Sequence, residues 1–157
     1  MAEGANKPIA ILAEDTVLVA EALRNILVQK EYEVRSAESC AAAMKEIKAL
    51  PEGITPALLV TDFGLKGFDT GVDLIKQARS LYPAIPVVMI TGAPNDAMDA
   101  MSQEGVDQET LEILAKPFVP NQLTTAIQSA EAKAATISTT HRDRLGGGGK
   151  TERGGVL

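Results

Sequence analysis

The chain of 157 residues is 45% hydrophobic, which is enough for one domain with a substantial core. Its formal net charge of −6 argues against a dedicated nucleic-acid surface, and its single cysteine excludes an internal disulfide or a multi-cysteine metal site. The N-terminus lacks the features of a signal peptide, and no run of about 18 apolar residues could span a membrane. We therefore expect a cytoplasmic protein with neither nucleic acid nor membrane as a partner.

Short apolar runs alternate along the chain with segments whose apolar residues recur at helical spacing. After a flexible N-terminus over 1–6, the pattern predicts a strand at 8–13, a helix at 16–30, a strand at 32–37, a helix at 39–50, a buried strand at 57–61, a helix at 72–82, a strand at 86–91, a helix at 96–103, a strand at 111–115 and a helix at 120–135. Five strands that alternate with five helices are typical of a doubly wound, mostly parallel α/β sheet with helices on both faces.

The composition changes at residue 136, where glycines and charged residues replace the apolar pattern. We expect a disordered, Gly-rich tail over 136–157, which leaves 7–135 as the single domain. The GGGGKT stretch in the tail is not a phosphate-binding loop, because Arg144 stands six residues before Lys150, where that motif needs a glycine.

Polar residues stand at the carboxyl ends of four predicted strands. Glu14 and Asp15 follow the first strand, Asp62 follows the third, Thr91 ends the fourth, and Lys116 follows the fifth. Because parallel strands end at the same edge of a sheet, we expect these side chains to gather there. Three carboxylates would raise one another's pKa values, and a hard cation such as Mg²⁺ would relieve that repulsion. The lysine and the threonine suit a phosphoryl group bound beside the metal.

Each of these residues also has an ordinary structural explanation. Glu14 and Asp15 could stabilise the start of a helix, and Asp62 could be a turn residue before a glycine. Lys116 with Pro117 could simply form a loop. The convergence of all of them on one sheet edge favours a functional site.

The motifs ILAED, LLVTDFGLKG, VVMITG and ILAKPF occur in this order, each at a predicted strand end. On these motifs, residues 7–133 resemble a receiver domain of a bacterial two-component response regulator, of the stand-alone, single-domain type. The resemblance implies a flavodoxin-like sheet with strand order 2-1-3-4-5. It also implies that the domain takes a phosphoryl group from a histidine kinase or a phosphotransferase.

The resemblance further implies a role for each strand-end residue. Asp62 would accept the phosphoryl group, Lys116 would contact Asp62 and then the phosphate, and Thr91 would move to meet it. The bond between Lys116 and Pro117 is typically cis in the family. The Mg²⁺ ligands would be Glu14, Asp15, Asp62 and the backbone carbonyl of Gly64.

Three features depart from the family pattern. Ile113 stands where the family usually has an aromatic side chain that swings inward on phosphorylation, so this coupling would take another form. The segment 105–116 is longer than usual, and Lys66 occupies a position where proline is common. We expect a downstream protein to bind through the 105–135 face, unless the domain acts as a phosphate sink or relay.

Two other function classes fit part of the pattern. A pseudo-receiver adaptor would bind partners without phosphorylation, which the complete set of acids, threonine and lysine argues against. A haloacid dehalogenase-like phosphatase also uses a strand-end aspartate and Mg²⁺, but it needs a second acid where Gly64 stands. We therefore expect a phosphoacceptor switch with at most slow self-dephosphorylation, and not an enzyme.

Overall fold

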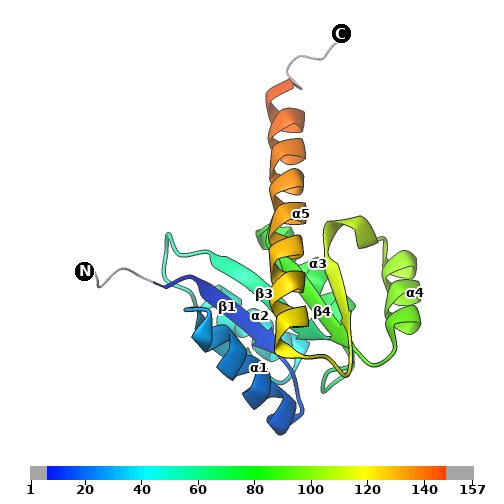
Figure 1. The fold of residues 1–157 in the computed structure, drawn as a ribbon. Coiled ribbons are helices and arrows are strands. Elements are labelled where there is room, and N and C mark those ends of the chain that lie inside the picture. The colour runs from blue at the N-terminus through cyan, green and yellow to red at the C-terminus, as the bar shows by residue number, and fades with distance from the viewer. Residues whose placement is uncertain (1–6, 148–157) are drawn as a thin grey trace.

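The computed structural model describes residues 7–147, with side chains described as far as residue 137 (Figure 1). Along the chain the elements are β1 (Ile9–Ala13), α1 (Val17–Gln29), β2 (Glu33–Ala37), α2 (Cys40–Lys48), β3 (Pro56–Asp62), α3 (Gly71–Leu81), β4 (Val87–Thr91), α4 (Pro94–Glu104), the short 3-10 helix η1 (Gln108–Thr110), β5 (Glu112–Ala115) and α5 (Pro120–Gly147). Each predicted strand and helix is present, and most of the bounds differ from the predicted ones by only one or two residues.

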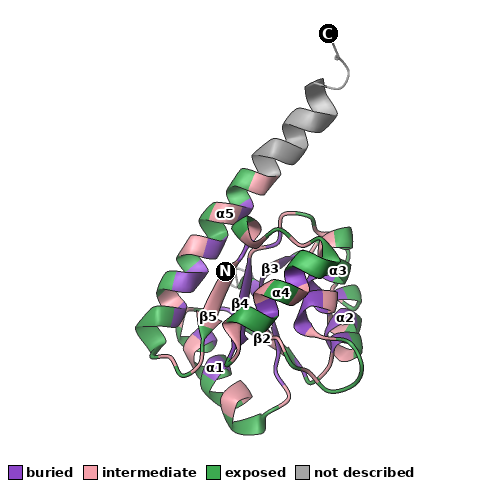
Figure 2. Ribbon diagram, turned by 90° about the vertical axis from the view of Figure 1, so that its right-hand side faces the viewer, coloured by how far each residue is buried: buried purple, intermediate pink, exposed green. Residues whose placement is uncertain are grey.

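All five strands pair in parallel in the order β2-β1-β3-β4-β5, which confirms the predicted sheet and its strand order. The central strands β1 and β4 are buried along their whole length, because helices cover both faces of the sheet. Figure 2 shows this burial concentrated on the strands and on the inner sides of the helices. Burial on both faces explains why these strands are continuous apolar runs in the sequence.

The sheet separates two hydrophobic cores, and alternate residues of each strand point into one or the other. One core lies under α2, α3 and α4 and includes Ile11, Ile47, Leu59, Ile75, Met89 and Met101. The other lies under α1 and α5 and includes Leu12, Leu27, Val60, Ile90 and Ile127. Because a shift of one residue would exchange the two faces, this packing fixes the register of the strands and the position of their carboxyl ends.

Helix α5 is longer than the sequence analysis predicted. The predicted helix end at residue 135 was wrong, because α5 continues to Gly147 and its C-terminal part extends beyond the sheet (Figure 1). The physical reason is that 136–145 contain neither glycine nor proline, so nothing stops the helix before the glycines at 146 and 147. The rest of the predicted tail, 148–157, and the predicted flexible segment 1–6 lie outside the described residues.

Between residues 7 and 147, no helix combines the length and the apolar character that a membrane crossing requires.

A buried tyrosine joins α5 to the segment between α1 and β2. The Tyr32 hydroxyl donates a hydrogen bond of 3.2 Å to Glu131 Oε2, and Tyr32 is only 8% exposed. Burial, together with the negative charge of Glu131, raises the pKa of Tyr32 to about 12. The neutral phenol is therefore the form that the folded protein stabilises.

We expect the free energy of unfolding to fall as the pH rises from 10 to 12. The phenol ionises near pH 10 when the chain is unfolded and near pH 12 when it is folded. Its contribution is therefore fully present below pH 10 and is lost as the pH rises through the folded value. In the Tyr32→Phe variant, the free energy of unfolding measured with urea should fall less steeply between pH 10 and pH 12. Tyr82→Phe is the matched control, and an unchanged slope in Tyr32→Phe would contradict the assignment.

Candidate functional site

The carboxyl ends of β1, β3, β4 and β5 meet at one edge of the sheet. Glu14 and Asp15 follow β1, and Asp62 ends β3. One oxygen from each of these three carboxylates lies within 4.8 Å of the other two. The structure thus brings the three predicted acids within reach of one common cation, and an all-oxygen donor set suits Mg²⁺.

Glu14 is the most buried of the three acids, with 3% of its surface exposed. Its Oε2 accepts a hydrogen bond of 3.1 Å from the Thr16 N–H, and its Oε1 lies 3.5 Å from Lys116 Nζ. Burial, and to a smaller extent the charge of Asp62, raises the pKa of Glu14, although the Thr16 N–H and the Lys116 ammonium act against that shift. More positive charge at this edge would therefore stabilise the ionised form of Glu14.

Lys116 lies between two of the acids. Its Nζ donates a hydrogen bond of 3.0 Å to Asp62 Oδ2, and its backbone N–H donates one of 2.8 Å to the Thr91 carbonyl. Burial lowers the pKa of Lys116, but the hydrogen bonds and charges of Asp62 and Glu14 outweigh burial, so the pKa is raised overall. The side chain is a stable ammonium at neutral pH. The bond between Lys116 and Pro117 is cis, as the resemblance implied.

Thr91 and Gly64 complete the predicted set. Thr91 is 3% exposed, and its hydroxyl oxygen accepts a hydrogen bond of 2.9 Å from the Ala93 N–H. Among the described residues the hydroxyl makes no hydrogen bond to Asp62 or Lys116, so its own hydrogen is free for another acceptor. Gly64 is exposed in the loop after β3, two residues beyond Asp62. The predicted movement of Thr91 and the predicted ligand role of Gly64 stay predictions.

The sequence analysis missed the residues that hold the main chain of Asp62. The Thr61 hydroxyl donates a hydrogen bond of 2.8 Å to the Asp62 carbonyl. A Cβ added to Gly71 would lie 2.2 Å from the same carbonyl oxygen, so only glycine lets α3 begin this close to β3. The signal in the sequence was the capping box of Thr70 and Asp73, which sets the start of α3 at Gly71.

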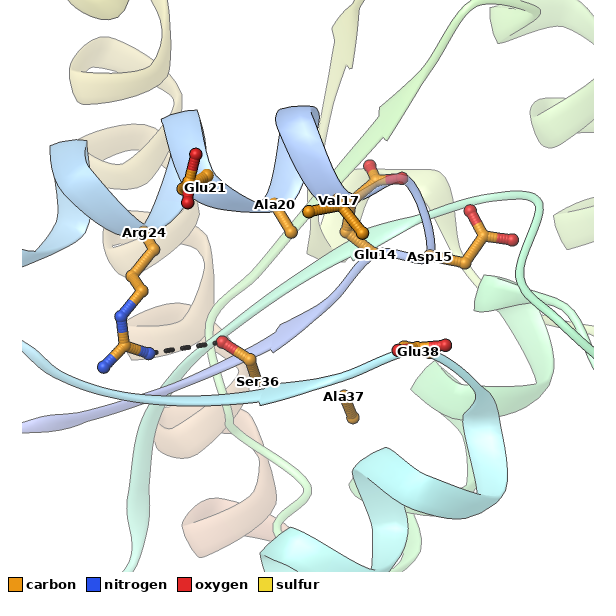
Figure 3. A pocket seen from close by; sticks show the side chains of 9 residues that line it. All are labelled: Glu14, Asp15, Val17, Ala20, Glu21, Arg24, Ser36, Ala37 and Glu38. Atoms are coloured by element: carbon orange, nitrogen blue, oxygen red, sulfur yellow. Dashed lines mark hydrogen bonds between the residues drawn. The ribbon is translucent and has the colours of Figure 1, made fainter.

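A pocket of about 280 Å³ opens beside the acidic cluster, between α1 and the end of β2 (Figure 3). Four acids and one base line it: Glu14, Asp15, Glu21, Glu38 and Arg24. The guanidinium lies at the far end from Asp15, where its Nη1 is 3.4 Å from Ser36 Oγ. This pocket suits a cation or water, and a phosphoryl group is better accommodated on the side of Lys116.

Most of this chain is similar to known proteins. Residues 10–128 match the family described as the response regulator receiver domain. The chain is 25% identical to the C4-dicarboxylate transport transcriptional regulatory protein DctD of Rhizobium meliloti over 130 residues, which cover 83% of this chain and 26% of DctD. It is also 25% identical to the transcriptional regulatory protein CreB of Escherichia coli over 128 residues, which cover 82% of this chain and 52% of CreB.

The chain therefore spans about a quarter and about half of these two regulators. Among solved structures, it is similar to a response regulator receiver protein from Sinorhizobium medicae, with a TM-score of 0.65 and 26% identity. That likeness covers 82% of this chain and 98% of the other. The strand order, the acids at the carboxyl edge and the match over residues 10–128 agree, and the chain belongs to the response regulator receiver domain family.

Proposed function

We propose that this receiver domain is a phosphoacceptor switch in which Asp62 takes a phosphoryl group from a histidine kinase or a histidine phosphotransferase. The observation that carries the proposal is the contact of 3.0 Å between Lys116 Nζ and Asp62 Oδ2, beside two further acids. Because the Lys116 ammonium binds one carboxylate oxygen of Asp62, the other oxygen is free to attack phosphorus. The same ammonium can then offset the negative charge of the transferred phosphoryl group.

In the transfer, an Asp62 oxygen forms a bond to phosphorus as the bond from phosphorus to the donor histidine nitrogen breaks, and that nitrogen keeps the electron pair. Lys116 offsets charge on the phosphoryl oxygens, and the Thr91 hydroxyl donates its hydrogen to one of them. Mg²⁺, held by Glu14, Asp15, Asp62 and the Gly64 carbonyl, would supply further charge neutralisation when bound. Slow attack of water on the acyl phosphate would reset the switch. The phosphodonor, a downstream protein partner and a cytoplasmic location are parts of the same proposal.

We expect Asp62→Asn to abolish phosphorylation by acetyl phosphate with Mg²⁺, measured as the loss of the one-phosphoryl adduct in intact mass spectrometry. The substitution keeps the size of the side chain and removes one negative charge from the cluster, so the fold should persist. Asp69→Asn, which changes an exposed acid in the same loop, is the matched control and should label normally.

Other outcomes of this experiment separate the alternatives. Equal labelling of Asp62→Asn would exclude Asp62 as the acceptor. Rapid consumption of acetyl phosphate with no adduct on the unmodified protein would indicate a phosphatase. An unmodified protein that neither gains an adduct nor consumes acetyl phosphate would indicate an adaptor that works without phosphorylation.

We expect Asp15→Asn to weaken Mg²⁺ binding by about tenfold or more, and Glu14→Gln to weaken it less. The Glu14 oxygens already bind the Thr16 N–H and Lys116, whereas Asp15 makes no hydrogen bond or salt bridge with another described residue. Titration of amide NMR signals with Mg²⁺ measures both affinities. Glu21→Gln alters an acid of the adjoining pocket and should change little. A larger loss in Glu14→Gln would reverse the assignment of direct and indirect ligands.

We expect the 105–135 face to carry the signal to a downstream protein. The Lys116 N–H is bonded to the Thr91 carbonyl, and Ile113 of the neighbouring strand is partly buried against the core. A groove of about 410 Å³ runs between β5 and α5, lined by residues that include Ile113, Leu114 and Gln122. A change around Thr91 therefore has a short path to a surface that a protein can bind.

Amide NMR shifts with and without beryllofluoride and Mg²⁺ test this expectation. Signals of residues 105–135 should move together with those around Asp62. Signals of the loop at 51–55, which lies beyond the opposite ends of the strands, should stay in place. If only the residues around Asp62 respond, this face does not transmit the signal, and a passive phosphate sink becomes the better account.

A further inference from the structure

The loop between β3 and α3, residues 63–70, is attached to the domain at its start, middle and end. At its start, the Phe63 N–H donates a hydrogen bond of 3.2 Å to the Ile90 carbonyl. Just after its end, the Gly71 N–H donates a hydrogen bond of 2.8 Å to the Phe63 carbonyl. In its middle, Lys66 Nζ lies 2.6 Å from Glu38 Oε1, and the Lys66 N–H donates a hydrogen bond of 3.3 Å to the Glu38 carbonyl. We call this Glu38–Lys66 pair the latch.

The latch lies beside the acidic cluster. Strand β1 runs between β2 and β3, so the loops that follow β2 and β3 join each other just beyond the end of β1, where Glu14 and Asp15 begin. Asp15 and Glu38 line the same pocket, as Figure 3 shows, and the Asp15 charge acts on the Lys66 ammonium. The latch is also two residues from Gly64, the proposed carbonyl ligand.

We propose that the latch positions the loop after β3, and with it the Gly64 carbonyl, for metal binding; this inference rests on the proposed function. Gly64 and Gly67, the latter with φ of 90°, allow the loop backbone more conformations than other residues would, so the loop needs an anchor to hold one of them. An anchor in the middle of the loop orders it during folding, so the ordering cost does not fall on metal binding. Lys66 is thus a positioning residue, which acts through the main chain of its own loop.

If Lys66 acted only through its charge, the Lys66→Glu variant would change the Mg²⁺ affinity in the direction opposite to that expected for the latch. If only its charge near Asp15 mattered, Lys66→Glu would tighten Mg²⁺ binding, and Glu38→Lys would weaken it. If the latch positions the loop, both single variants weaken binding, because each places two like charges face to face. The double variant, Glu38→Lys with Lys66→Glu, restores an opposite pair and should restore the affinity.

The experiment measures the Mg²⁺ affinity of the full chain by amide NMR titration at fixed ionic strength. Each single variant should bind about three- to fivefold more weakly, the upper range for an exposed ion pair, and the double variant should return to within about twofold of the unmodified protein. The Lys76–Glu104 pair, at 2.8 Å and also at the surface, joins α3 to α4 and is the matched control. Reversal of either of its charges should leave the affinity unchanged.

A second readout uses the metal-free protein. Exchange of the Lys66 amide hydrogen, which is bonded to the Glu38 carbonyl, should be faster in both single variants and slow again in the double variant. Single variants that change the affinity in opposite directions, or a double variant without recovery, would overturn the latch while the metal site stands. If the unmodified protein binds no Mg²⁺, the proposed metal site fails, and the role of the latch fails with it.

Discussion

The Lys116 ammonium is the positive charge on which the whole carboxyl edge of the sheet depends. It lies 3.0 Å from Asp62 and 3.5 Å from Glu14, and the latter is almost completely buried. Without it, a buried acid would face a second acid with no cation to compensate, which is among the most costly arrangements in a protein. One ammonium against three carboxylates still leaves negative charge in excess, and the charge of Asp62 adds to burial in raising the pKa of Glu14. Added positive charge at this edge would therefore stabilise the ionised forms of these acids.

The two hydrophobic cores hold these charges together. Because β1, β3 and β4 are central strands with helices on both faces, their ends cannot shift without disturbing a closely packed interior. Asp62 is fixed further by Thr61, which bonds its carbonyl, and by Gly71, whose missing side chain lets α3 pack against it. The strand order therefore matters as much as the residues themselves, because it brings their side chains together.

Burial on both faces also explains what the sequence could predict. Continuous apolar runs identified the central strands, and the polar residues that end those runs predicted that Asp62 and Lys116 meet at one edge, where they are in contact. The capping box marks the start of α3 at Gly71, but the close approach of Gly71 to the Asp62 carbonyl could not be predicted from the sequence. The latch could not be predicted either, because Glu38 and Lys66 are 28 residues apart. The end of α5 was missed for another reason. The polar residues after 135 suggested disorder, but polar residues without glycine or proline can continue a helix.

Strand β5, which carries Ile113 where the resemblance implies an aromatic side chain, is the edge strand of the sheet. The segment before β5 is held to α3 by Arg79, which bonds the Thr110 hydroxyl at 2.6 Å and the Thr110 carbonyl at 2.7 Å. The edge strand β5 is short and only partly buried, and its far end is joined to β4 through Lys116. The segment before β5 is therefore held by Arg79, and the residue after β5 is Lys116, which also bonds Asp62. If Asp62 accepts a phosphoryl group, as proposed, its direct connection to β5 and to the β5–α5 groove runs through Lys116 and not through the segment held by Arg79.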